Sequence, residues 1–541
     1  MNINSIIKNL QQNLAENDRI KTVSKHFAGL HSNGDRVAFV RGLLEETAVL
    51  PRLVSDAKND RTSATTRERG NEHFKRRRLK DAIDSYTQSL AHAETPQNYS
   101  KALANRSAAL FELQLYPECL TDIDRALENG YPDDLKPKLL RRKDNALKLL
   151  ESKTYPPYYL PVPVIPEPFK SKSIECASDS IEIATSPSQG RHIIATRDIQ
   201  IGEVLAVEEP YSSLLSSEYY IHCHECLKLC YNLLPCSKCT EVFYCDDACR
   251  TEALEYHQYE CSILKTLRSL GLTKMQLLPF KIALGVKEIP SARRTGLYKS
   301  DRYAEIHDLV ANTERRTVAD LFERAATAAA IHHLLHKHTS FFEASGLEDL
   351  FDEVLMLHLQ TAPCNFHEIS ESAPSDGGDG VHRTAEIGAG AYAFLSLFNH
   401  GCDPNVARHC HGRAIVVRAI RRIAEGEECR DNYGYHFAIT SKPERLESLK
   451  KQYFFDCSCS ACSDDWPLFE ALPRDGAASG LADEDLAKLS AGARRSAAAL
   501  ASKLPPLMGG VEAEAAPGRA FAEMQEALKQ CYALLGNRRL K

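Results

Sequence analysis

Cysteine and histidine side chains occur along one stretch of the chain at spacings typical of metal ligands. The stretch contains four pairs: Cys223-x-x-Cys226, Cys236-x-x-Cys239, Cys245-x-x-x-Cys249 and His257-x-x-x-Cys261. Each short spacing lets two ligands from one turn reach the same ion, and eight nitrogen or sulfur ligands suffice for two tetrahedral zinc ions. Because protein atoms fill all four positions of each ion, such ions stabilise a fold and leave no position for a reacting water.

Composition favours metal over disulfides in this chain of 541 residues and 18 cysteines. The start, Met1-Asn2-Ile3-Asn4-Ser5, is polar and unlike a secretory signal, and no run of eighteen or more apolar residues predicts a membrane span. We therefore expect a protein of nucleus and cytoplasm, where thiols stay reduced and clustered cysteines bind metal more often than they form disulfides or remain free. The net charge of -6 gives no sign of nucleic-acid binding.

Four further segments contain residue types suited to holding a cofactor. They are Gly190-Arg191-His192, Asn399-His400-Gly401-Cys402, Glu427-Glu428 leading to Tyr433-Gly434, and Tyr453-Phe454-Phe455 followed by Cys457-x-Cys459-x-x-Cys462. Each alone is unspecific, because glycine turns and single tyrosines are usually structural. In this order, with the eight-ligand stretch between the first two, they resemble the family of SET and MYND domain-containing protein-lysine methyltransferases.

The resemblance implies S-adenosylmethionine as methyl donor and lysine side chains of histone or other proteins as substrates. As catalytic residues, Tyr433 would orient the substrate amine and Tyr453 would line the lysine channel. The residues implied to bind the cofactor are Gly190, Arg191, His192, Asn399, His400, Tyr433 and Phe455. His192 stands where the family more often has glycine, and Cys429-Arg430-Asp431-Asn432 is more polar than the family's usual approach to the tyrosine.

The resemblance also implies how the ligands are shared among three structural zinc ions. The first ion takes Cys223, Cys226, Cys245 and Cys249, the second takes Cys236, Cys239, His257 and Cys261, and the third takes Cys402, Cys457, Cys459 and Cys462. Cys230 lies inside the cysteine-rich stretch but outside this scheme. The third ion would hold the C-terminal flap against the cofactor pocket, so it would support catalysis without taking part in it.

A physical requirement explains why a lysine methyltransferase needs a buried channel. The amine of lysine has a reference pKa of about 10.4, so only about 0.1% of it is neutral at physiological pH. Methyl transfer requires the lone pair of the neutral amine. A narrow apolar channel disfavours the ammonium form and restricts the approach of the amine to one line.

A repeat of helical character precedes these segments. Gly70 in the first unit corresponds to Ser107 in the second, 37 residues later, and both small residues let paired helices approach closely while Tyr86 and Ile123 fill the seam. The spacing is close to the 34-residue period of tetratricopeptide repeats. A further helix is expected at about 135–152.

Tetratricopeptide co-chaperones have a peptide clamp that five residues of this chain resemble. These residues are Arg67, Asn71, Asn105, Lys138 and Arg142. Amide and cationic donors on successive helices would converge on the terminal carboxylate of an acidic chaperone peptide. The alternative is a basic, solvated helix face.

Other cysteine and histidine residues carry no metal prediction. His332, His333, His336 and His338 share one predicted helix, and two of their spacings suit a metal-binding face. No second set of ligands lies nearby in the sequence, so we expect a solvated face. Cys364, Cys410 and Cys429 are expected to be buried small residues.

The predicted architecture is α+β and multidomain, with helical tetratricopeptide repeats, a β-rich SET domain split by a MYND zinc finger and a helical insert, a zinc-bound post-SET segment and a helical tail. The predicted boundaries are 1–62 for the N-terminal helices, 63–152 for the repeats, 153–172 for a proline-rich linker, 173–222 and 386–440 for the two SET parts, 223–261 for the finger, 262–385 for the insert, 441–465 for the post-SET segment and 466–541 for the tail. Two polar helices are expected before residue 62, a glycine-rich loop at 372–380, and loose packing of the tail.

A binding protein is the alternative function. In that hypothesis a catalytically weak SET fold keeps its zinc ions and recruits histone deacetylase, other co-repressors or chaperones through the finger and the repeats. The presence of Tyr433, Asn399, His400 and Phe455 favours the enzyme.

Overall fold

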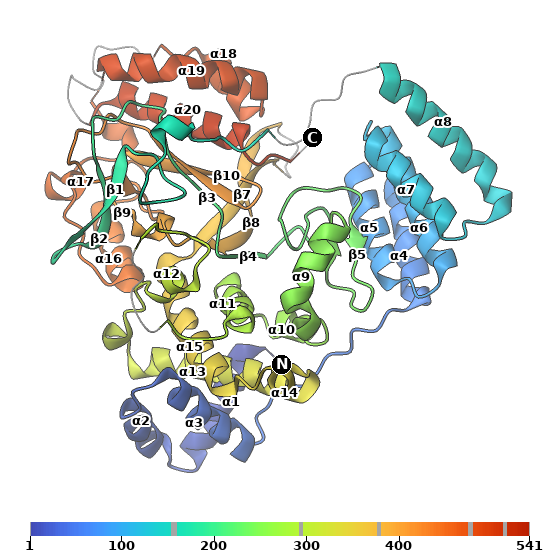
Figure 1. Ribbon diagram of the computed structural model, residues 1–541, viewed down its shortest axis with the longest axis horizontal. Helices are drawn as coiled ribbons and strands as arrows, with labels where there is room; N and C mark the ends of the chain where they lie inside the picture. Colours follow the sequence, from blue (N-terminus) through green and yellow to red (C-terminus); the bar gives the residue numbers. More distant parts are fainter. Residues whose placement is uncertain are drawn as a thin grey trace. The chain divides into compact units, whose positions relative to one another are not determined.

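The computed structural model describes residues 2–152, 160–290, 296–375, 380–473, 480–511 and 517–539. The chain forms two compact units, each built from separate stretches of sequence (Figure 1). The first unit consists of Met1–Pro157, Leu214–Lys287 and Val318–Met356, and the second consists of Tyr158–Ser213, Glu288–Thr317 and Leu357–Lys541. The repeats and the cysteine-rich stretch therefore belong to the first unit, and all four cofactor segments belong to the second.

Three amphipathic helices begin the first unit: α1 (Ile3–Glu16), α2 (Ile20–Ala28) and α3 (Asn33–Glu46). The sequence pattern predicts two helices before residue 62, and this is wrong. The chain turns between α1 and α2 because Asp18 takes a left-handed conformation with a φ of 54°. Helix α3 packs against α13 (Val318–His338).

Five helices of the predicted repeat region lie side by side in Figure 1, and successive helices pack against each other. They are α4 (Asp60–Lys75), α5 (Leu79–His92), α6 (Pro96–Glu112), α7 (Tyr116–Glu128) and α8 (Lys136–Ser152). Gly70 on α4 meets the ring of Tyr86 on α5, because a Cβ atom at position 70 would lie 2.5 Å from Tyr86 Cε1. The close approach of α4 and α5 therefore depends on the missing side chain.

A buried ion pair fixes two repeat helices to the cysteine-rich stretch. Arg106 on α6 and Asp122 on α7 are both 0% exposed and form two hydrogen bonds of 2.7 and 2.9 Å. The same guanidinium donates to the carbonyl oxygen of Leu233 over 2.9 Å. A buried charge that loses its partner is strongly destabilising, so this arrangement holds α6, α7 and Leu233 in one geometry.

The cysteine-rich stretch has little regular structure. It contains two very short strands, β5 (Leu234–Pro235) and β6 (Phe243–Tyr244), and the helix α9 (Asp247–Glu260). Helices follow, as the sequence predicts for residues 262–360. These helices are α10 (Leu264–Ser269), α11 (Lys274–Gly285), α12 (Tyr303–His307), α13, α14 (Phe341–Ser345) and α15 (Glu348–Asn365), of which α12 belongs to the second unit and α15 to both.

Short strands build the second unit, and the runs predicted near 181, 190, 204 and 415 are all strands. Strand β1 (Ile181–Ser186) pairs with β2 (Gly190–Ala195), and β10 (Val406–His411), β11 (Ala414–Ala419) and β3 (Val204–Glu208) form an antiparallel sheet. A second three-stranded sheet has the order β4 (Ser212–Leu215), β8 (His382–Ala391) and β7 (His367–Pro374). Strands β9 (Asn399–His400) and β12 (Arg430–Asp431) pair in parallel, and the helices α16 (Lys442–Tyr453) and α17 (Ser460–Ser463) follow.

The loop predicted at 372–380 is shorter than expected. Residues 372–374 complete β7, where the Ser372 N–H donates to the Asn537 carbonyl over 2.9 Å. This bond to the tail extends the strand beyond the point at which polar composition predicts a turn. Residues 376–379 of the predicted loop, and 153–159 of the predicted linker, lie outside the described residues.

The predicted loose packing of the tail is wrong. Helices α18 (Asp483–Ser490), α19 (Arg494–Val511) and α20 (Arg519–Leu535) form one layer beside the strands (Figure 1) and share a buried core with Ile201 and Ile420. Beyond α20, the side chain of Asn537 accepts from the Gly412 N–H and donates to the Gly412 carbonyl oxygen. The backbone N–H of Asn537 donates to the Cys410 carbonyl oxygen over 2.8 Å. The tail is thus an integral part of the second unit.

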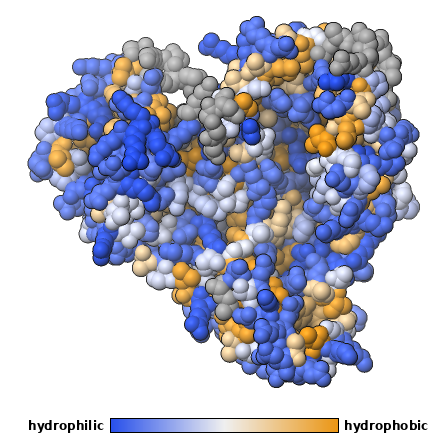
Figure 2. Space-filling model, turned by 180° about the vertical axis from the view of Figure 1, so that it is seen from behind, coloured by the Kyte–Doolittle hydropathy of each residue, from blue (hydrophilic) through white to orange (hydrophobic). Residues whose placement is uncertain are grey.

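Hydrophilic residues cover most of the surface seen in Figure 2, with smaller hydrophobic areas between them. In the described ranges, none of the helices has the length and apolar character that a bilayer span requires.

We predict that Gly70→Ala destabilises the first unit. Alanine raises helix propensity by about 1 kcal/mol, but its Cβ atom collides with the Tyr86 ring, and overpacking of this kind costs about 1–3 kcal/mol. Thermal unfolding followed by circular dichroism should show a lower Tm. Gly42→Ala on α3 is the matched control, because nothing lies within 4 Å of its Cβ position; an equal or higher Tm is expected there. A Gly70→Ala variant as stable as the control would contradict the close approach.

Candidate active site

A cavity of about 490 Å³ in the second unit collects residues from distant parts of the chain. Six of the seven residues that the sequence assigns to the cofactor line it, and so does the second predicted catalytic residue. They are Gly190, Arg191, Asn399, His400, Tyr433, Phe455 and Tyr453. His192 is not among the lining residues: it is buried, and its Nδ1 lies 3.1 Å from the Gly190 carbonyl oxygen. Strand alternation turns His192 away from the face that Arg191 presents.

Backbone pairing sets the position of Asn399 and His400. Because β9 pairs with β12, Asn399 lies beside Arg430 and His400 beside Asp431. The Asn399 amide donates to Glu428 Oε1 over 2.8 Å, and Glu428 Oε2 forms an ion pair with Arg430 at 2.8 Å. The wall of the cavity here is therefore a connected set of polar groups with fixed orientations.

Tyr433 is held at both its backbone and its hydroxyl. Its N–H donates to His400 Nδ1 over 3.1 Å, and its hydroxyl donates to the Phe398 carbonyl oxygen over 2.8 Å. Burial raises the pKa of Tyr433 well above its ordinary value, so the phenol remains protonated. The ring of Tyr453 lies 4.8 Å from that of Tyr433, between centroids.

His400 connects the tyrosine to a cysteine cluster. Burial lowers the pKa of His400 to about 4, so the imidazole is neutral at physiological pH. Because Nδ1 accepts the Tyr433 N–H, the proton of the neutral ring is on Nε2, which lies 3.3 Å from Cys402 Sγ. The side chain of His400, and not only its backbone, is therefore part of the site.

Three groups of four ligand residues come together, with all ligand atoms of a group within 4.8 Å of one another. The groups are the three sets that the family resemblance implies: Cys223, Cys226, Cys245 and Cys249; Cys236, Cys239, His257 and Cys261; Cys402, Cys457, Cys459 and Cys462. Sulfur–sulfur distances of 3.5 to 3.9 Å occur in all three. Tetrahedral zinc with bonds of about 2.3 Å places sulfur atoms about 3.8 Å apart, so these donor sets fit zinc.

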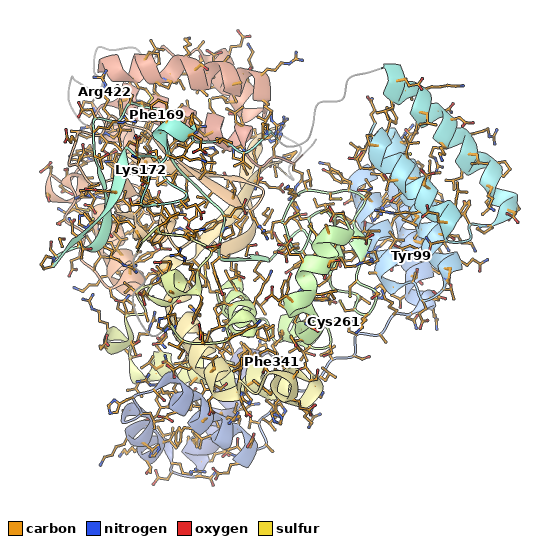
Figure 3. All side chains as sticks on the ribbon, viewed as in Figure 1. Tyr99, Phe169, Lys172, Cys261, Phe341 and Arg422 are labelled. Carbon is orange, nitrogen blue, oxygen red and sulfur yellow. The ribbon has the colours of Figure 1, made fainter. Side chains whose placement is uncertain are left out.

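Glu260 orients the histidine of the second group. Its Oε1 lies 2.9 Å from His257 Nδ1 and 3.1 Å from Nε2 of the buried His224, while His257 Nε2 faces Cys236 Sγ at 3.3 Å. A carboxylate on one ring nitrogen of histidine fixes the ring so that the other nitrogen can bind metal. Figure 3 shows the last ligand of this group, Cys261, at the end of α9. The spacing pattern omits Glu260 and His224, although Glu260 directly precedes Cys261 in the chain.

The third group adjoins the cavity. Cys402 Sγ lies 3.5 Å from Cys462 Sγ and 3.9 Å from Cys457 Sγ. Cys457 and Cys459 themselves line the cavity, beside Phe455. The segment after α16, which contains Cys457, Cys459 and Cys462, is therefore held next to Asn399 and His400 by this cluster.

The polar segment before Tyr433 is fully partnered. Arg430 pairs with Glu428, Asp431 with Arg408 on β10, and the Asn432 amide donates to the Gly401 carbonyl oxygen over 3.0 Å. Cys429 and Cys410 are buried, as predicted. Cys364 is only partly buried and lines the cavity, so the prediction of a buried residue is wrong for it.

Sequence motifs missed a part of the cavity wall. Leu309, Val310, Asn312 and Arg315 line it, from the segment after α12, together with Asn365 at the end of α15. The sequence treats these residues as part of a helical insert, and no spacing in them signals a cofactor site.

Four of the five predicted clamp residues gather on the repeat helices. The Asn105 amide donates to Asn71 Oδ1 over 2.8 Å, and Arg142 donates to the Ala104 carbonyl oxygen. Burial raises the pKa of Tyr86 to about 12, although the charges of Arg67 and Arg142 act to lower it, so both cations lie near that phenol. Lys138 is exposed on α8, one helical turn before Arg142.

The histidines of α13 do not form one solvated face. His332 is buried: its Nδ1 lies 2.7 Å from Asp352 Oδ1, and its ring stacks on Phe342 at 4.7 Å. The prediction is wrong for His332 because α13 is covered on most of its circumference. His336 is exposed, as predicted.

A buried carboxylate positions the turn that leads to Asn399. Glu208 on β3 accepts the N–H groups of Phe394 and Leu395 over 2.8 and 2.7 Å. Burial raises the pKa of Glu208 to about 7, against the lowering effect of these hydrogen bonds. No motif pointed to Glu208, because its role depends on strand β3 lying beside residues almost two hundred positions later.

Comparison with known proteins shows which family model and which relatives this sequence is similar to. Residues 190–434 match the family model described as SET domain. The chain is 26% identical to the protein-lysine N-methyltransferase SMYD4 of Mus musculus, over 75% of this chain and 68% of that protein, and 27% identical to SMYD4 of Danio rerio, over 79% and 69%. It is 28% identical to the histone-lysine N-methyltransferase SMYD3 of Mus musculus, over 52% and 61%.

We predict that Glu208 makes folding stability fall as the pH rises. The unfolded carboxyl has a pKa of about 4.3 and the folded one about 7. The stabilising contribution of the proton is therefore fully present below about pH 4.3 and is lost as the pH rises through 7. The Tm of the unmodified protein should fall relative to that of Glu208→Gln between pH 5 and 8. Glu209→Gln, whose side chain is exposed, is the control, and a pH-independent difference between the protein and Glu208→Gln would contradict the prediction.

Proposed function

We infer that this chain, which carries a SET domain at residues 190–434 and is similar to SMYD4 over three quarters of its length, is a protein-lysine N-methyltransferase. The observation that supports this inference most directly is the single cavity at which segments near 190, 400, 433 and 455 meet. SET methyltransferases use S-adenosylmethionine, which supplies an electrophilic methyl group on a sulfonium ion. Phe455 offers an aromatic surface for a purine, and Asn399 and Arg191 offer donors for an amino-acid part.

The hydrogen bond between Tyr433 and Phe398 supports a role in amine binding for two oxygen atoms. Its hydroxyl hydrogen is directed to the Phe398 carbonyl oxygen, so the remaining lone pairs of the phenol can accept from a substrate amine. The carbonyl oxygen of Phe398 has a second lone pair close by. An amine held by these two acceptors loses its rotational freedom and keeps its own lone pair directed along the channel. The neighbouring rings of Tyr433 and Tyr453 would exclude water from the amine and so disfavour its ammonium form.

Zinc completes the proposal as a structural metal. Three ions would be held by the three ligand groups, two in a MYND finger and one behind the flap. None of the groups leaves a free position for substrate, so the ions stabilise the fold. Substrates would be lysines of histone or other proteins in nucleus and cytoplasm.

The helical repeats would bind a peptide. We propose that the repeats bind the carboxylates of an acidic C-terminal peptide from a chaperone or a co-repressor. The donors would be Arg67, Asn71, Asn105 and Arg142, with Lys138 at the rim. The hydrogen bond between Asn71 and Asn105, and the nearness of Arg67 and Arg142 to Tyr86, support this proposal.

We predict that Tyr433→Phe lowers the rate of methyl transfer at least about 100-fold, because loss of an orienting contact at the reacting centre has effects of this size. Transfer from radiolabelled S-adenosylmethionine to a histone mixture measures the rate, and calorimetry should show nearly unchanged cofactor affinity. Tyr435→Phe is the control, since Tyr435 is bonded to Gln452 and does not line the cavity. Full activity of Tyr433→Phe would refute the assignment. Absence of cofactor binding at full zinc occupancy would favour the scaffold function.

We predict that the double change Lys138→Ala and Arg142→Ala weakens binding of a short peptide with two glutamates before a free C-terminus at least about tenfold, since charge-assisted hydrogen bonds to the carboxylate are lost. Fluorescence anisotropy measures the affinity. Arg141→Ala with Lys148→Ala removes the same charge from exposed positions of α8 and should leave the affinity unchanged. A peptide whose C-terminus is amidated should not bind the unaltered chain. Equal affinity of the two double variants would overturn the clamp.

A further inference from the structure

Arg445 on α16 is the largest charged side chain buried in the catalytic unit. It is 0% exposed and lies among the residues that surround the third ligand group. Its Nη1 donates to the Thr440 carbonyl oxygen over 2.7 Å, and its Nη2 donates to the Ala461 carbonyl oxygen over 3.3 Å. The Thr440 carbonyl belongs to the turn before α16 and the Ala461 carbonyl to α17, so the guanidinium connects this turn with α17.

Besides the two carbonyl oxygens, this guanidinium faces a sulfur atom of the third ligand group. Nη2 lies 3.7 Å from Cys462 Sγ. Within the described part of the chain, no carboxylate forms an ion pair with Arg445. A buried charge without a counter-charge is very costly, and the fold retains this one.

A metal-bound cluster provides the counter-charge. Four neutral thiols carry no charge, whereas zinc with four thiolates carries a net charge of -2. One buried guanidinium beside such a cluster neutralises half of that charge. His400 Nε2 also faces the cluster, 3.3 Å from Cys402 Sγ, but its neutral ring supplies no charge.

We propose that Arg445 is the internal counter-cation of the third cluster and determines whether its four cysteines retain zinc. This inference rests on the proposed zinc occupancy of that cluster. It also gives Arg445 a positioning role, because Cys457 and Cys459 line the cofactor cavity and Phe455 precedes them. The first two ligand groups belong to the other unit, so they act as internal references.

Zinc content and release of the full chain test the proposal. Arg445→Lys keeps the charge, Arg445→Gln keeps hydrogen-bond donors without the charge, and Lys450→Met removes an exposed cation from the same helix. Zinc is measured by mass spectrometry after purification and by a chromophoric chelator over time. We expect three ions in the unmodified chain, in Lys450→Met and in Arg445→Lys, with faster release of one ion from Arg445→Lys, and two ions in Arg445→Gln.

The outcomes separate the two proposals. Two ions or fewer in the unmodified chain would refute zinc at the third cluster itself. Three ions in the unmodified chain and equally slow release from Arg445→Gln would overturn the role of Arg445 alone. If Arg445→Gln does not fold, the rates of zinc release from the unmodified chain and from Arg445→Lys are compared. Equal rates for all three ions in both proteins would also overturn the role of Arg445. Calorimetry with S-adenosylmethionine should show weaker binding, by at least tenfold, only in the variant that has lost the third ion.

Discussion

The meeting of Cys402 with Cys457, Cys459 and Cys462 is the constraint on which the active site depends. These residues are up to 60 positions apart, yet their sulfur atoms lie within 4.8 Å of one another. The pairing of β9 with β12 places Asn399 and His400 next to Cys402, and the flap places Phe455 next to Cys457. If the sulfur atoms separated, Phe455 and Tyr453 would leave the cavity together. This wall of the cavity is therefore positioned by the gathering of the four cysteines more than by regular secondary structure, of which this region has little.

Charged and titratable groups in the interior carry much of the remaining architecture. Arg106 and Asp122 neutralise each other in the first unit, Glu208 accepts two backbone N–H groups in the second, and Arg445 faces thiol sulfur atoms. In each case a group that is expensive to bury joins elements that are remote in sequence. Such groups specify one arrangement, because any other leaves a charge or a donor without a partner.

The residues of the ligand groups and many residues of the cavity could be predicted from the sequence, because chemistry restricts the residue types at these positions. Few residues besides cysteine and histidine hold zinc, so short spacing indicates pairs such as Cys223 and Cys226. The grouping of Cys223 with Cys245 follows from the family resemblance alone. Positions that act through the backbone or through shape leave no such signal. Arg315 and Asn312 line the cavity because of where the chain turns after α12, and His332 is buried because of what covers α13. The prediction that His192 binds the cofactor is not supported, because alternation along β2 directs its side chain away from the cavity.

The bonds of Asn537 to Cys410 and Gly412 also order events during synthesis. Ribosomes deliver the chain from the N-terminus, and the residues assigned to the first unit end at Met356, within α15. The second unit closes its sheet edge with a residue near the end of the sequence described here. The cysteine-rich stretch can thus leave the ribosome before the residues that complete the second unit, and a product that ends before Asn537 lacks the bonds that close the turn between β10 and β11.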